Sequence, residues 1–143
     1  GITDLCSLVA SNRRIVAPQP QTDPCGRYIA DQFSALGLDA AVAARLTAGT
    51  LMHSHGSGDL PGFLRDGRVE TGILYRSETG AIRDWVQVID LPPGQDCHEK
   101  IHFMISAIAQ DGACHPAADA FVTWMTGPAG QAMLVDAGFL PAV

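Results

Sequence analysis

One segment, RIVAPQPQTDPCGRYIADQF at residues 14–33, contains the pattern from which the architecture of the chain follows. Its apolar start, an isoleucine, a valine and an alanine in a row, is typical of a short buried strand. Prolines at positions 18, 20 and 24 then exclude regular structure from the loop, and Cys25-Gly26-Arg27 opens a helix. The segment therefore predicts a strand, a long loop and a helix N-terminus, in that order.

The same alternation of strand and helix continues on both sides of this segment. A short amphipathic helix is expected over residues 1–10, and a second helix is expected from Asp39, as its cap, to Leu46. Strands separated by helices predict the α/β class, with a mixed sheet, flanking helices and ligands at the carboxyl ends of the strands. The other expected strands are residues 50–54, 71–75 and 85–91, and the other expected helices are residues 59–65, 116–125 and 128–138.

The composition is that of an ordinary globular domain. The 143 residues are 47% hydrophobic and 17% charged, which excludes a disordered chain. The longest apolar run, residues 103–109 with one serine, is too short to cross a membrane. Nine basic and fifteen acidic residues give a net charge of -6, so nucleic acid is not an expected partner. The four cysteines form no C-x-x-C pair and are expected to be free thiols.

Two glycine-containing loops that follow predicted strands are candidates for a ligand site. Residues 22–27 end as the first turn of a helix, where free backbone amides and the helix dipole favour an anion. Residues 54–59, SHGSGD, combine two serine hydroxyls with glycines that let backbone amides approach a ligand. The structural alternative is that proline and glycine serve only the geometry of these turns, with Asp59 as a helix cap.

One short motif points to an enzyme instead. His98, Glu99 and His102 satisfy the H-E-x-x-H pattern, which on a helix brings two imidazoles to one zinc ion, with the glutamate as general base. No glutamate follows Glu99 to act as a third ligand, which leaves Asp111 and His115 as the alternatives for that role. Residues 101–109 are moreover predicted to form a strand, in which positions four apart are separated by roughly 13 Å. Because these two points count against a shared zinc ion, a zinc-dependent hydrolase is the alternative function and not the leading one.

The other signals for chemistry are less specific. His53 and His55, two residues apart, would lie on the same side of a strand, which suits the beginning of a metal site but equally a polar loop mouth. The sequence contains no nucleophile elbow, Walker loop or dinucleotide fingerprint, so no cofactor is expected.

Three parts of the sequence, taken in order, resemble the second half of a known family. They are residues 14–28, the block DGRVETGILYRS at residues 66–77, and the tail that begins GPAGQAML and covers residues 127–141. The family is that of the periplasmic molybdate-binding proteins of ABC importers, within the type II periplasmic binding protein superfamily. The likeness extends over about residues 4–140, and it implies a type II periplasmic-binding-protein-like lobe.

This resemblance implies a division of the chain. Residues 1–114 correspond to the second lobe of a two-lobed binding protein, and residues 115–143 to a C-terminal helical return segment. The first lobe, which carries two ligand serines in the family, has no counterpart among these residues. Because the chain begins at Gly1 without a signal peptide, it is expected to be a mature or trimmed piece.

The resemblance also implies a ligand site. In the family a small oxyanion lies between the two lobes, held by hydroxyls and backbone amides. The family's Pro-Ala-Gly turn matches the turn with Cys25 and Gly26, and its tyrosine hydroxyl falls on Tyr75. Counting back from Tyr75 places a further amide at Ser57, beside Gly58, where Gly-Ser-Gly replaces the family's Asn-Val-Arg.

The function implied is transport. The chain is expected to be part of a periplasmic solute-binding protein that catalyses no reaction and delivers molybdate or tungstate to an ABC permease. Without a first lobe, the apolar faces of its last two helices favour self-association of the isolated chain. The alternatives are the zinc hydrolase built on His98, Glu99 and His102, and a cytoplasmic oxyanion-sensing domain of a regulator.

Overall fold

The computed structural model describes residues 1–110 and 112–141, and the chain divides into two compact units, Gly1–Lys100 and Ile101–Val143. The boundary between the two units falls after Lys100, whereas the resemblance implies a second lobe that ends at residue 114. Residues 101–108, at the start of the second unit, contain neither helix nor strand.

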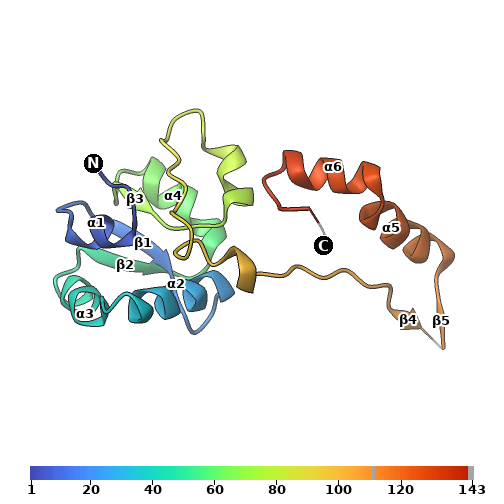
Figure 1. Ribbon diagram of the computed structural model, residues 1–143, viewed down its shortest axis with the longest axis horizontal. Coiled ribbons are helices and arrows are strands. Elements are labelled where there is room, and N and C mark those ends of the chain that lie inside the picture. Colours follow the sequence, from blue (N-terminus) through green and yellow to red (C-terminus); the bar gives the residue numbers. More distant parts are fainter. Residues whose placement is uncertain (111, 142–143) are drawn as a thin grey trace. The chain divides into compact units, whose positions relative to one another are not determined.

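A three-stranded parallel sheet forms the centre of the first unit (Figure 1). Its middle strand is β1 (Ile15–Pro18), which pairs with β2 (Leu51–Ser54) on one side and with β3 (Thr71–Gly72) on the other. The α/β class is therefore confirmed, although this sheet is parallel where the sequence predicts a mixed one. Strand β3 is shorter than the predicted residues 71–75 because its pairing with β1 ends at Gly72.

Helical segments precede, separate and follow these strands, as the sequence predicts. Asp39 is the first residue of its helix and not the predicted cap, a position that Leu38 takes. The helical elements of the first unit are α1 (Leu5–Ala10), α2 (Pro24–Ala35), α3 (Asp39–Thr47), η1 (Ser57–Asp59), α4 (Leu60–Arg65), η2 (Arg76–Ala81) and η3 (His98–Lys100), of which those labelled η are 3₁₀ helices.

Helix α2 follows directly from the sequence pattern. The Asp23 side chain caps its N-terminus, a proline occupies its first turn, and Gly37, with a φ of 68°, follows its C-terminus. Cys25, Ile29 and Phe33 recur at every fourth position and are all buried, so α2 presents one apolar face to the core.

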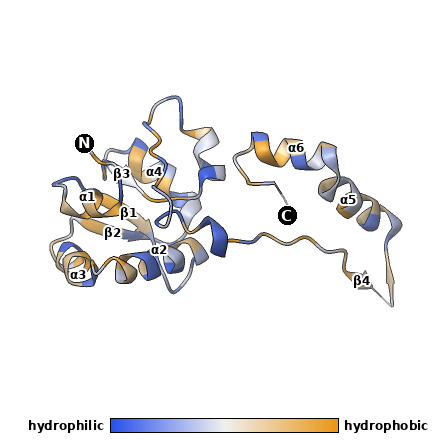
Figure 2. Cartoon of the chain, viewed as in Figure 1, coloured by the Kyte–Doolittle hydropathy of each residue, from blue (hydrophilic) through white to orange (hydrophobic). Residues whose placement is uncertain are grey.

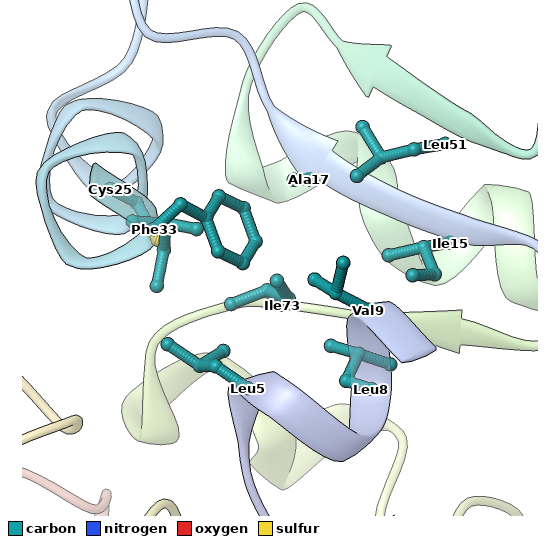
Figure 3. Packing of buried hydrophobic residues seen from close by; sticks show 10 residues of the cluster. Leu5, Leu8, Val9, Ile15, Ala17, Cys25, Phe33, Leu51 and Ile73 are labelled. Carbon is teal, nitrogen blue, oxygen red and sulfur yellow. The ribbon is translucent and has the colours of Figure 1, made fainter. Parts of the chain in front are cut away.

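Both faces of the sheet are covered, because side chains alternate along β1. Ile15 and Ala17 belong to a large cluster with residues of α1 and α2, which Figure 3 shows. Val16 belongs to a second cluster, with Leu60 of α4 and Val69. This packing fixes where the loops after the strands begin.

Two predicted strands are wrong. Trp85, the expected start of residues 85–91, lies in a turn in which its amide donates to the Ile82 carbonyl at 3.0 Å, and residues 87–90 have no regular structure. Of residues 101–109, only Ala109 belongs to a strand. An apolar segment also needs a partner strand for its backbone groups, and no described strand pairs with residues 85–91 or 101–108.

The second unit consists of a small hairpin and two helices. Strands β4 (Ala109–Gln110) and β5 (Ala113–Cys114) are antiparallel, and α5 (Pro116–Thr126) and α6 (Pro128–Asp136) follow. The two predicted helices are confirmed. Figure 2 shows hydrophobic residues along α6, yet Gly130 is the one buried residue within α5 and α6. Among the described residues, every helix is too short or too polar to traverse a lipid bilayer.

Candidate ligand-binding site

The candidate site lies at the carboxyl edge of the parallel sheet, where the segments after the three strands converge. The loop after β1 contains Asp23, the loop after β2 leads to Ser57, and the segment after β3 contains Tyr75. Because the strands are parallel, all three segments leave the sheet at the same edge. The Thr22 hydroxyl donates to the His55 carbonyl at 2.7 Å and so connects the first two loops.

The carboxylate of Asp23 joins the same two loops. Its Oδ1 accepts a hydrogen bond from the backbone amide of Cys25 at 2.7 Å, and its Oδ2 accepts one from the backbone amide of Ser57 at 2.9 Å. A β-carbon built on Gly56 would lie 3.4 Å from Oδ2, so the loop after β2 closely surrounds this carboxylate. The two amides that the resemblance assigns to an oxyanion therefore converge on one anionic group, which belongs to the protein itself.

A second carboxylate, that of Glu78 in η2, joins Ser57 to Tyr75. Its Oε1 accepts a hydrogen bond from the Ser57 hydroxyl at 2.6 Å, and its Oε2 accepts one from the Tyr75 backbone amide at 3.1 Å. None of the ion pairs among the described residues includes Asp23 or Glu78. The site thus combines amide and hydroxyl donors with two carboxylates that no basic side chain neutralises by a direct ion pair.

The side chain of Cys25 lies in the hydrophobic core (Figure 3). Its backbone amide donates to Asp23. Burial, followed by the negative charges of Asp23 and Glu78, raises the pKa of the Cys25 thiol to about 12. The thiol is therefore neutral at physiological pH. All four cysteines are free thiols in the structure.

Tyr75 is half-buried and packs against the large core cluster. Burial, followed by the charges of Cys25 and Asp23, raises the pKa of its phenol above the ordinary value of 10.0. The phenol therefore keeps its proton at neutral pH, and it remains a hydrogen-bond donor of the kind that the resemblance implies.

The two glycines of the predicted site have different surroundings. A β-carbon on Gly26 would lie 2.4 Å from the Pro18 carbonyl oxygen, so only glycine lets the first turn of α2 approach the end of β1. A β-carbon on Gly58 would meet no atom within 4 Å, and this glycine is exposed in η1 beside Ser57. The structure therefore brings Cys25, Ser57 and Tyr75 together, while Gly26 serves packing and Gly58 borders open space.

The histidine patterns do not assemble into a metal site in the structure. His98 belongs to the three-residue helix η3, and its Nδ1 pairs with Asp96 Oδ2 at 2.8 Å. This hydrogen bond raises the pKa of His98. His102 follows η3 outside any helix, so the two imidazoles of the H-E-x-x-H pattern do not share a helical face. His53 has Nδ1 3.4 Å from the Ala17 carbonyl oxygen.

No set of three or more histidine, cysteine, aspartate and glutamate side chains within residues 1–110 and 112–141 is arranged to hold a metal ion. Asp111, one of the two alternative third ligands, lies outside the described residues. His55 is exposed, and its backbone carbonyl accepts the Thr22 hydroxyl. His53 in β2 and His55 after it are therefore not surrounded by an assembled set of metal ligands among the described residues.

Sequence reasoning placed Asp23 in the candidate loop of residues 22–27 without assigning it a role, and it missed Glu78 as a member of the site. The signal for Asp23 was present, because an aspartate directly before a helix-opening proline is typical of an N-cap. Its contact with Ser57 had no local signal, since the two residues are 34 positions apart. Glu78 stands three residues after Tyr75, the spacing of a capping box, but tyrosine occupies the position that serine or threonine takes in that pattern, so the sequence did not predict the bond of Glu78 to the Tyr75 amide.

Comparison with known proteins identifies one matching protein family and one similar solved structure. Residues 1–140 match the family described as bacterial extracellular solute-binding protein. The fold is similar to a solved structure described as the substrate-binding domain of a molybdenum ABC transporter from Clostridium difficile, with a TM-score of 0.67 and 17% identity. The similarity covers 100% of this chain and 59% of that one, so the chain spans little more than half of that domain's length.

A search among curated proteins found no match. The family comprises binding proteins, which supports a binding rather than a catalytic role. The match extends over nearly the whole chain, from the first helix to the end of the last one. The chain belongs to the family of bacterial extracellular solute-binding proteins.

Proposed function

We propose that this chain is the second lobe and the C-terminal return segment of the solute-binding component of an ABC importer. The family supports the binding role and a location outside the cytoplasmic membrane, for which the periplasm is our proposal. The similar fold of a domain named for an ABC transporter supports delivery of the solute to an ABC permease.

The proposed solute is a small tetrahedral oxyanion, with molybdate or tungstate as the first candidates. One observation carries this proposal: the amides of Cys25 and Ser57, which come from different loops, point at the two oxygens of one carboxylate at 2.7 and 2.9 Å. A tetrahedral oxyanion presents pairs of oxygen acceptors to amides in the same way. The protonated phenol of Tyr75 would add a third neutral donor.

The proposal includes a first lobe that completes the site. The 59% coverage of the similar solved domain leaves room for such a lobe. The second unit also carries large apolar side chains that are exposed, and we propose that the first lobe covers this surface in the full-length protein. These side chains are Phe103, Met104, Ile108, Phe121, Trp124, Met133 and Leu140.

The hydrolase alternative is not favoured by the structure. It requires His98 and His102 on one helical face, and η3 ends at Lys100, before His102. The alternative of a cytoplasmic sensor would use the same ligand site, and no contact in the described residues favours it over the transport protein.

Isothermal titration calorimetry on the full-length, two-lobed protein tests the proposed function. Molybdate and tungstate should bind with a stoichiometry of one, while glucose, an uncharged polar solute, should not. Saturable binding of neutral solutes together with no heat from any of molybdate, tungstate and sulfate would contradict an oxyanion site.

A further inference from the structure

We propose that Asp23 is a specificity-determining residue that acts as an internal competitor of the oxyanion. Its carboxylate holds the two amides that the ligand would use, so the ligand binds only by displacing it. This inference rests on the proposed function, because it concerns the same amides. It goes further because it assigns to Asp23 an effect on affinity: the carboxylate weakens oxyanion binding, whereas a ligand-binding residue would strengthen it.

The contact between Asp23 and Ser57 goes beyond what helix capping requires. A cap needs one side-chain oxygen on a free amide of the first turn, which Oδ1 provides to Cys25. Asp4, the cap of α1, is an ordinary example, since its carboxylate accepts hydrogen bonds from Ser7 and Thr3, which lie within three residues of it. Asp23 instead directs its second oxygen to an amide 34 residues away on another loop.

The charge at the site makes this competition strong. A dianion that enters while Asp23 stays in place would meet a carboxylate at van der Waals distance and that of Glu78 close by. Glu78 is bonded to Ser57 and Tyr75, and neither carboxylate has an ion-pair partner among the described residues. Two unit charges of the same sign about 4 Å apart repel each other by about 1 kcal/mol even in water. Asp23 must therefore rotate away before the amides can bind the ligand.

The two loops do not depend on Asp23 alone to stay together. The Thr22 hydroxyl donates to the His55 carbonyl at 2.7 Å, and the Gln19 amide donates to the Ser54 carbonyl at 3.0 Å. When the carboxylate leaves, these bonds keep the amides of Cys25 and Ser57 close to each other. The site that Asp23 vacates therefore remains an anion site.

The test is calorimetry with sodium molybdate on the full-length protein and on three variants. Asp23→Ser removes the charge but keeps a good helix cap, and Asp23→Asn removes the charge with little change in shape. Asp4→Ser is the matched control, because it makes the same change at the cap of α1. Amide resonances of Cys25 and Ser57 in ¹⁵N–¹H spectra report directly whether the carboxylate bonds are present.

Both Asp23 variants should bind molybdate at least about tenfold more tightly than the wild type, given the charge repulsion that they remove. Asp4→Ser should bind like the wild type, and molybdate should shift the Cys25 and Ser57 amide resonances of the wild type. Equal or weaker binding by both Asp23 variants, with molybdate still bound by the wild type, would overturn the role of Asp23 and leave the proposed function intact. Absence of binding by the wild type and by all variants would overturn both.

Discussion

The Ser57 hydroxyl donates a hydrogen bond of 2.6 Å to Oε1 of Glu78, and this bond connects the loop after β2 to the 3₁₀ helix after β3. Because the other oxygen of Glu78 accepts the amide of Tyr75, the bond positions the backbone that carries the tyrosine. One carboxylate thus orders two of the three residues of the proposed site.

Removal of this hydroxyl should destabilise the first unit. Ser57→Ala leaves the Glu78 carboxylate without one donor in a partly buried position, which should lower the free energy of unfolding by roughly 1.5–3 kcal/mol. Ser77→Ala is the control, because the Ser77 side chain has no hydrogen bond to any residue that the structure describes, and it should change stability by less than about 0.5 kcal/mol. Urea denaturation followed by circular dichroism measures both. Equal decreases in the free energy of unfolding of the two variants would show that the hydrogen bond to Glu78 does not stabilise the first unit.

The two glycines of the predicted site should respond in opposite ways to alanine. In Gly26→Ala the new methyl would lie 2.4 Å from the Pro18 carbonyl oxygen, so α2 must shift from the end of β1. The expected loss is at least about 2 kcal/mol. In Gly58→Ala the methyl meets nothing within 4 Å, and reduced freedom of the unfolded chain should leave stability unchanged or raise it by up to about 1 kcal/mol. A tolerated Gly26→Ala would mean that the first turn of α2 is not packed on β1 as described.

Burial of Cys25 should make the first unit sensitive to alkali. The folded chain keeps the thiol protonated up to a pKa of about 12, whereas the unfolded chain ionises it near 9.0. The stabilisation is therefore complete below pH 9.0 and is lost as the pH rises towards about 12. Over this interval the wild type should lose roughly 1.4 kcal/mol per pH unit more than Cys25→Ala does. Tyr75 contributes to the pH dependence of both proteins, and identical slopes in the two would argue against a buried thiol.

The apolar surface of the second unit should make the 143-residue chain associate with itself. Met104 and Ile108 are 95% and 84% exposed, and such surface favours contacts between copies or exchange of the terminal helices. Light scattering should therefore detect dimers or larger species, and the double variant Met104→Ser/Ile108→Ser should reduce them. Ile89→Ser, in the first unit, is the control and should not. A monodisperse monomer for the wild-type chain would contradict the proposal that a first lobe normally covers this surface.

The parts of the fold that the sequence predicts are those encoded locally. Apolar residues 15–17, the prolines after them and the cap at Asp23 are neighbours in sequence, so β1 and α2 follow from short-range rules. The predicted strand at residues 85–91 fails because alternation alone does not supply a pairing partner. The contact of Asp23 with Ser57 joins residues far apart in sequence, and only the parallel pairing of β1 with β2 brings their loops together.

The resemblance to molybdate-binding proteins supplied the positions of Cys25, Ser57 and Tyr75, and no local pattern would have chosen these three. It did not predict that the Asp23 carboxylate accepts hydrogen bonds from the amides of Cys25 and Ser57. Asp23 stands directly before the turn that matches the family, and its effect on the site depends on a side-chain direction that a sequence pattern does not specify.

The most direct test of the account is the affinity of the full-length protein for molybdate, compared by calorimetry with that of Tyr75→Phe and Cys25→Ala. The account predicts that loss of the Tyr75 hydroxyl weakens binding by about tenfold or more, since it removes one hydrogen bond to a charged ligand. Cys25→Ala, which keeps the amide, should bind as the wild type does. Equal molybdate affinity in the wild type and Tyr75→Phe would contradict the assignment of this edge of the sheet as the oxyanion site.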